Sequence, residues 1–322
     1  MVSVISDFGY VFNGQGGAAR ISPQDIHKKQ RGLTWIHVDY QDENNQALIE
    51  KLSLNKTITA ALLDKDTSPR FIAHKKGFLL IMRGINFDRR EAEDMIALRV
   101  WLEKKRLITL SHRSIPCIPF LQDALRRGKG PKDPVDCLLA IAVCMMQNIA
   151  LSVRWLHDVT DDLEDAVIEE QGYSTRGLYR RVADIRHKIL GLRRYIAPQE
   201  DVFKTLAGAA HPLFGPDHLP QLTDIDADLR KALEDLDYMR DHTAITQTQL
   251  DNKMNIIFTQ AMYLMSIIVV IFTPLTFITG LLGSNIGGIP FGAHPNGFLL
   301  ITLILLGIAL LQIILLKRKK WF

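Results

Sequence analysis

Residues 254–316 read MNIIFTQAMYLMSIIVVIFTPLTFITGLLGSNIGGIPFGAHPNGFLLITLILLGIALLQIILL, and this stretch decides the fold. It contains no Asp, Glu, Lys or Arg, although 23% of the 322 residues of the chain are charged. A helix needs about 20 apolar residues to cross the hydrocarbon core of a bilayer. The stretch therefore predicts two membrane-spanning helices, at about 256–282 and at 298–316, joined by the glycine- and proline-rich loop 283–297.

Basic residues beyond this stretch predict its orientation. Four of them follow the second span at positions 317–320, whereas the loop has no Lys or Arg. Basic residues favour the cytoplasmic side, so the tail 317–322 and, across the hairpin, the N-terminal part are expected in the cytoplasm. The N-terminus has no apolar segment typical of a signal peptide. The net charge of +4 comes from this tail and gives no argument for nucleic acid as a partner.

Residues 1–133 predict an N-terminal α/β subdomain. Leu33–Asp39 alternates apolar and polar residues as a strand does. Phe71–Phe87 and Met95–Ser111 each hold two β-rich runs around polar turn residues, which is typical of hairpins. Asn44–Asp64 has the apolar spacing of a helix.

Residues 134–220 predict a helical subdomain. Val135–Gln171 and Arg176–Ala207 are amphipathic and nearly free of helix breakers. Two of the three cysteines, Cys137 and Cys144, would share one face of the first of these helices. Together with Cys117 they are interpreted as buried thiols in a reducing cytosol rather than as a metal site or a disulfide framework.

A long helix is predicted for residues 221–282. Its apolar positions follow a 3-4-3-4-3 spacing typical of a coiled-coil seam, at Leu222, Ile225, Leu229, Ala232, Leu236 and Met239. The pattern weakens at Thr243 and Thr246 and resumes at Leu250. The expected fold is thus an α+β cytoplasmic domain, followed by a long α-helical stalk and two transmembrane helices.

Sequence motifs of enzymes are absent. The chain has no P-loop, no HExxH and no GxSxG, so we expect neither an enzyme nor an organic cofactor. An acidic run can concentrate cations or can be a solvated helix face, and it comprises Asp161, Asp162, Glu164, Asp165, Glu169 and Glu170.

The first span is the predicted pore-lining element. At about 100° per residue, one face of this helix collects four hydroxyl side chains and Met262. Its pore-lining candidates are Thr259, Met262, Ser266, Thr273 and Thr276. Two helices cannot enclose a pore, so conduction would require a homo-oligomer. The alternative is a plain two-helix anchor whose hydroxyls bond back to their own helix.

The loop after the first span predicts a pore mouth at Gly283, Ser284 and Asn285. Divalent ions such as Mg²⁺ dehydrate reluctantly, and a ring of neutral amide and carbonyl oxygens suits a hydrated ion. His294 is the one imidazole in the uncharged stretch. It is either a metal-capturing residue at the mouth or a solvated loop histidine.

This chain resembles the CorA superfamily of divalent-cation transporters and, within it, the zinc-transporting ZntB branch. The resemblance covers nearly the whole chain. It rests on the stretch IFTPLTFITGLLGSNIGGIP at 271–290, on LRRYIAPQE at 192–200, on Gly130-Pro131 and on Lys320-Trp321. Ser284 departs from the methionine of the magnesium branch and from the aliphatic residue more frequent in the zinc branch.

The resemblance implies a homopentameric funnel in the inner membrane of a bacterium. It also implies transport of Zn²⁺, with Cd²⁺, Ni²⁺ or Co²⁺ as further ions and with proton coupling. A magnesium/cobalt channel of the same architecture is the first alternative. A membrane-anchored cytoplasmic enzyme or scaffold is the alternative from another class.

Overall fold

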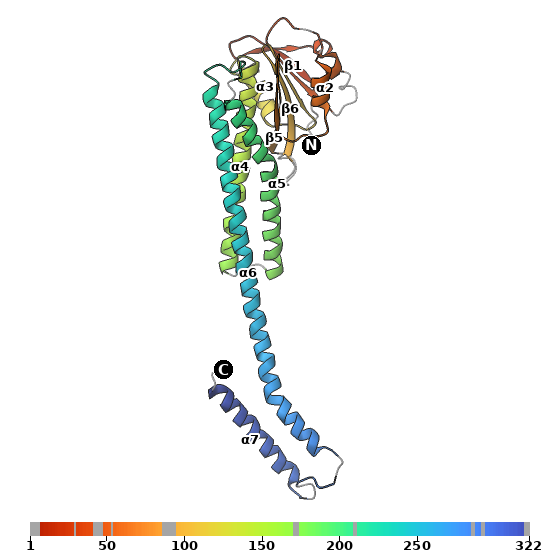
Figure 1. The fold of residues 1–322 in the computed structure, drawn as a ribbon, viewed down its shortest axis with the longest axis vertical. Coiled ribbons are helices and arrows are strands. Elements are labelled where there is room, and N and C mark those ends of the chain that lie inside the picture. The colour runs from red at the N-terminus through yellow and green to blue at the C-terminus, as the bar shows by residue number, and fades with distance from the viewer. Residues whose placement is uncertain are drawn as a thin grey trace. The chain divides into compact units, whose positions relative to one another are not determined.

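The computed structural model describes residues 7–28, 30–40, 48–52, 54–85, 95–169, 174–208, 211–284, 287–290 and 294–318. The chain divides into two compact units, Met1–Gln247 and Thr248–Phe322, which we describe one at a time. Figure 1 shows the first unit as a sheet with helices, and the second as the end of helix α6 and helix α7.

The sheet of the first unit has seven strands in the order β2-β1-β3-β7-β6-β5-β4. They are β1 (Phe8–Phe12), β2 (Ala18–Ile21), β3 (Thr34–Asp39), β4 (Arg70–His74), β5 (Gly77–Ile85), β6 (Met95–Glu103) and β7 (Arg106–Ser111). Neighbouring strands pair antiparallel except β3 and β7, which run parallel with Thr34 opposite Arg106. This parallel pair joins the N-terminal strands to the two later hairpins.

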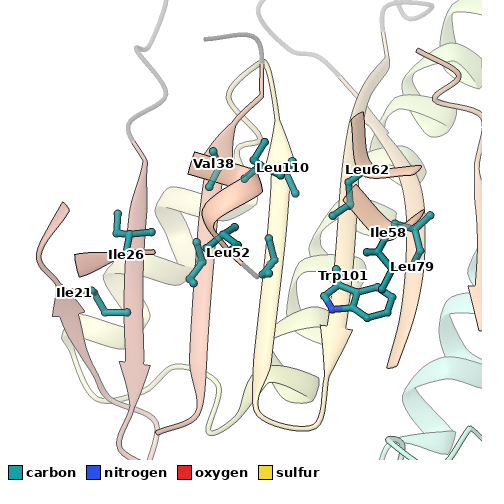
Figure 2. Packing of buried hydrophobic residues seen from close by; sticks show 12 residues of the cluster. Ile21, Ile26, Val38, Leu52, Ile58, Leu62, Leu79, Trp101 and Leu110 are labelled. Carbon is teal, nitrogen blue, oxygen red and sulfur yellow. The ribbon is translucent and has the colours of Figure 1, made fainter. Parts of the chain in front are cut away.

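Helices cover both faces of the sheet. On one face, Ile58 and Leu62 of α2 (Lys56–Leu63) belong to the same buried cluster as Leu79 and Trp101 of the sheet (Figure 2). Asn55 begins α2 by accepting a hydrogen bond from the amide of Thr57. The other face of the sheet contacts α4 (Pro134–Glu169) through β5, β7, β3 and β6.

Helix α4 is apolar enough to span a membrane by length and composition, as are α6 (Leu219–Leu282) and α7 (Gly297–Arg318). Its most apolar window is 50% buried within the first unit, against 6% for those of α6 and α7. Since α4 packs on the sheet, its hydrophobicity belongs to a protein core. Helices α3 (Cys117–Arg126) and α5 (Thr175–Gly208) both contact it.

Helix α6 begins in the first unit, where its seam is buried. All six predicted seam positions from Leu222 to Met239 are at most 4% exposed. The seam continues through Thr243 and Thr246, which are also buried. Their hydroxyls donate to the carbonyls of Arg240 and His242 one turn earlier. Each buried hydroxyl is thereby satisfied, so the polar residues do not interrupt the packing.

The structure confirms the predicted strands and long helices and adds others. Among the described residues, the sequence analysis did not anticipate β1, β2, α3 and the 3₁₀ helix at Pro23–Asp25. Between positions 44 and 64, the helical residues described are 48–51 and α2, with Asn55 between them; positions 44–47 lie outside the described residues. The prediction of a single continuous helix over this range was therefore wrong.

The cysteines require a further correction. Cys117 of α3 and Cys144 of α4 form a disulfide, with their Cα atoms 5.9 Å apart. The two cysteines are 27 residues apart and lie in different helices. The sequence analysis did not predict the disulfide, because helical spacing relates only residues of one helix, such as Cys137 and Cys144. Cys137 is a free buried thiol, as predicted, and its pKa lies well above the ordinary value because burial disfavours the thiolate.

Candidate functional site

The candidate site is the hydroxyl-bearing face of α6 in the second unit. All of its predicted members are exposed, and they are Thr259, Met262, Ser266, Thr273 and Thr276. They fall on one face because about 100° separates successive residues of a helix. Position 254 and every later residue of α6 are uncharged, so any ion at this face meets neutral dipoles.

The opposite face of α6 is less exposed. Its stripe comprises Ile267, Ile271, Leu275, Ile278 and Leu282, and Ile267 is only 6% exposed. Helix α7 carries a stripe of similar spacing at Ile301, Leu305, Ile308, Gln312 and Leu316. Spacings of three and four residues are those of helices packed side by side. We interpret the two stripes as the contact faces of the hairpin, which leaves the hydroxyl face of α6 free.

The hydroxyl groups on this face differ in their hydrogen bonds. Ser266 donates to the carbonyl oxygen of Met262 at 2.9 Å, one turn earlier. The hydroxyls of Thr259, Thr273 and Thr276 have no hydrogen-bond partner within the described segments. Back-bonding, the behaviour expected of a plain anchor, thus accounts for one of the four hydroxyls. The other three can meet water or the hydration shell of an ion.

Two further residues shape this helix. Met262 is 61% exposed and is the large apolar member of the face. Pro274 lies inside α6, where it removes one backbone hydrogen bond of the helix. Such a site can act as a bending point.

The predicted mouth is described in part. The amide of Gly283 donates to the carbonyl of Thr279 at 2.8 Å, and Ser284 donates its hydroxyl to the carbonyl of Leu281 at 2.7 Å. Both residues therefore close the last turn of α6. Asn285, the third member, lies outside the described residues.

His294 lies in the turn before α7. Its Nδ1 accepts a hydrogen bond from the amide of Asn296 at 3.1 Å, and its carbonyl accepts from the amide of Gly297 at 2.9 Å. This bond engages Nδ1, so the imidazole helps to organise the turn before α7, and Nε2 is the ring nitrogen that remains for another partner.

Histidines contact the acidic run on α4. Asp161 lies 3.1 Å from Nδ1 of His157, and Glu164 lies 3.2 Å from Nδ1 of His242 on α6. Tyr238 contacts the rings of both histidines. Within the described segments no group of three or more His, Cys, Asp or Glu side chains is arranged to hold a metal ion. As far as it is described, the run joins α4 to α6 rather than forming a metal site.

An ion pair also joins α5 to the N-terminal half of α6. Arg193 donates from Nε to Asp237 at 2.8 Å and from Nη2 to its other carboxylate oxygen at 3.3 Å. These bonds hold the pKa of the Asp237 carboxyl below its usual value. Sequence reasoning missed this pair, because no local pattern links residues that are 44 positions apart.

Known proteins resemble this chain over nearly its whole length. Residues 30–318 match the family described as CorA-like Mg²⁺ transporter protein. The chain is 30% identical over 320 residues to the divalent cation transporter CmaX of Pseudomonas aeruginosa, which covers 98% of this chain and 96% of that protein. It is also 30% identical over 316 residues to the zinc transport protein ZntB of Yersinia enterocolitica, with 98% and 95% covered.

A solved structure supports the fold. The complete structure of the CorA magnesium transporter from Methanocaldococcus jannaschii superposes with a TM-score of 0.84, at 19% identity and with 100% of both chains covered. Together with the match over residues 30–318, it shows that the chain has the fold of this family. The chain belongs to the CorA-like family and is a divalent-cation transporter of the membrane, not an enzyme.

Proposed function

We propose that this chain transports Zn²⁺ across a bacterial inner membrane, through a pore lined by the hydroxyl face of α6. The observation that carries the proposal is that this face is exposed while the opposite face of α6 is less exposed and has the spacing of a packed contact. Zinc as the ion is supported by the relative from Yersinia enterocolitica, which is named a zinc transport protein.

A pore requires several copies of the chain. One hairpin of α6 and α7 encloses no space, so copies of the exposed face must surround an axis. We propose a homopentamer, with both termini of each chain in the cytoplasm. The basic residues 317–320 near the C-terminus and the uncharged loop 283–297 support this orientation.

The residues of the face suggest how an ion passes. Thr259, Ser266, Thr273 and Thr276 would present oxygen atoms to the hydration shell of the ion, while Met262 would form an apolar constriction suited to gating. Gly283, Ser284 and Asn285 would form the outer mouth. Since no fixed charge lies on this path, the affinity of the ion for each position stays low enough for it to leave again.

Cysteine accessibility tests the pore face. Single cysteines at positions 259, 262, 273 and 276 are expected to react with a membrane-impermeant thiol reagent and to lose transport after reaction. Cysteines at positions 267, 271 and 278 are the matched controls, since they lie on the less exposed face of α6. Labelling of the second set in place of the first would refute the assignment, and protection of both sets would favour a plain anchor.

Metal flux into proteoliposomes tests the ion. We expect uptake of Zn²⁺ in preference to Mg²⁺ and a faster uptake when a pH gradient is imposed. The second candidate is a channel for Mg²⁺ or Co²⁺, which the description of the matching family as a Mg²⁺ transporter supports. Ser284 departs from the residue of both branches and therefore favours neither ion. Preferential flux of Mg²⁺ would establish this second candidate.

His294 has a separate test. If it captures metal at the mouth, His294→Ala lowers the apparent zinc affinity. If it serves only the turn before α7, as its bond to the amide of Asn296 suggests, the zinc affinity and the pH dependence of uptake both stay unchanged.

A further inference from the structure

Three loops rich in basic residues meet at one end of the sheet in the first unit. Lys28 follows the 3₁₀ turn η1 (Pro23–Asp25), Lys76 lies in the β4–β5 turn, and Lys105 lies in the β6–β7 turn. These residues line one cavity of about 310 Å³. We propose that this cavity binds a small organic phosphate of the size of a mononucleotide, a ligand distinct from the transported ion.

The floor of the cavity is apolar and the rim is cationic. Ile26, Ile36 and Leu52 line it from below and are each at most 2% exposed. Lys76 and Lys105 are exposed at the rim. These three side chains offer a ligand a small apolar contact, while ammonium groups on flexible stems reach a phosphate.

Charge at the rim is unbalanced. Glu103 is the carboxylate that lines the cavity, and it already accepts from Nε1 of Trp101 at 2.9 Å and pairs with Arg106 at 3.3 Å. Among the described residues no carboxylate pairs with Lys76 or Lys105. Lys28 has its own partner, Asp25, at 2.6 Å. Two ammonium groups at a partly enclosed cavity thus remain without a counter-charge, which favours an anion.

Hydrogen bonds hold the wall in place. Arg106 donates from Nη1 to the carbonyl of Leu52 at 2.9 Å, and the amide of Thr34 donates to the carbonyl of Lys105 at 2.9 Å. The side-chain amide of Gln30 donates to the carbonyl of Asp25 at 3.0 Å. The loops are therefore positioned without a ligand, which lowers the entropy that a ligand must overcome on binding.

Size argues for an organic phosphate rather than an inorganic ion. Sites for small organic molecules have volumes of roughly 300–1,000 Å³. For comparison, one water molecule takes roughly 30 Å³ of liquid volume. The cavity, at about 310 Å³, lies at the lower end of the first range and is much larger than one phosphate needs. Its apolar floor would stay unoccupied by an inorganic ion.

Calorimetric titration of the full-length protein in detergent, with EDTA present to remove metal ions, tests the proposal. The probes are AMP, adenosine, inorganic phosphate and glycerol 3-phosphate, the last representing a lipid headgroup. We expect saturable binding of one AMP per chain, tighter than that of the other three probes. Equal binding of inorganic phosphate or of adenosine would overturn the organic-phosphate assignment, and equal binding of glycerol 3-phosphate would overturn a ligand of mononucleotide size. The absence of AMP binding would overturn the whole proposal.

A double variant locates the site. Lys76→Ala/Lys105→Ala is expected to weaken AMP binding by roughly tenfold or more, because two charge-assisted contacts are lost. Lys204→Ala/Lys231→Ala removes two exposed charges from α5 and α6 and is expected to leave binding unchanged. Both variants should keep the wild-type melting temperature. Unchanged AMP binding in the first variant would refute the location, and neither result depends on which metal ion is transported.

Discussion

His37 makes the stability of the first unit depend on pH. It lies in β3, is 1% exposed and stacks on Phe8 with ring centroids 5.1 Å apart. Its Nδ1 lies 2.9 Å from the hydroxyl of Thr109, and its Nε2 lies 3.4 Å from the hydroxyl of Ser111. Burial lowers the pKa of this imidazole from 6.5 to about 3, because the surroundings solvate the charged ring poorly.

The direction of the effect follows from where the proton binds. The unfolded chain takes up a proton on His37 below pH 6.5, whereas the folded chain does so only near pH 3. The full stability is therefore present above pH 6.5 and falls as the pH drops toward 3. Each pH unit in this window costs about 1.4 kcal/mol, so His37 lowers the free energy of unfolding by about 2 kcal/mol at pH 5.

The variant His37→Gln removes the titration while keeping a side chain that can hydrogen-bond. Urea denaturation of the detergent-solubilised protein, followed by tryptophan fluorescence, gives the free energy of unfolding at pH 7.5 and pH 5. Wild type should lose about 2 kcal/mol more than the variant between these pH values. His27→Gln, at an exposed position, is the control and should behave as wild type. Equal losses in wild type and His37→Gln would refute the reasoning.

Three further changes should also lower stability. Leu236→Ala empties a position on the α6 seam that is 0% exposed, and denaturation should show a loss of about 2–5 kcal/mol, with less than 1 kcal/mol contradicting the packing. Reduction of the Cys117–Cys144 disulfide, whose cysteines are 27 residues apart, should lower the free energy of unfolding by about 3–4 kcal/mol, because the unfolded chain is no longer cross-linked. In Cys117→Ser, which lacks the disulfide, the reductant should have no such effect. Gly16→Ala places a Cβ 2.9 Å from two backbone carbonyl oxygens at φ +92° and should cost more, by calorimetry, than Gly14→Ala at φ +77°, where nothing lies within 4 Å.

The membrane part could be predicted from the sequence because its signals are local. The charge-free residues 254–316 require a nonaqueous environment, and the break at 283–297 separates two helices of spanning length. The position of the hydroxyls on one face of α6 follows from helical geometry alone. The seam from Leu222 to Met239 was visible for the same reason, since residues three and four apart are neighbours on a helix.

Only the tertiary structure decided features that join distant parts of the chain. Helix α4 was predicted from its amphipathic pattern, but only the structure shows that its apolar face packs on the sheet through β5, β7, β3 and β6. The parallel pairing of β3 with β7 and the Cys117–Cys144 disulfide join different elements, and no periodicity within one element predicts such contacts. The cationic cavity arises in the same way. Lys28, Lys76 and Lys105 read separately as ordinary turn lysines, and they face one volume only because the sheet brings their three loops to the same end.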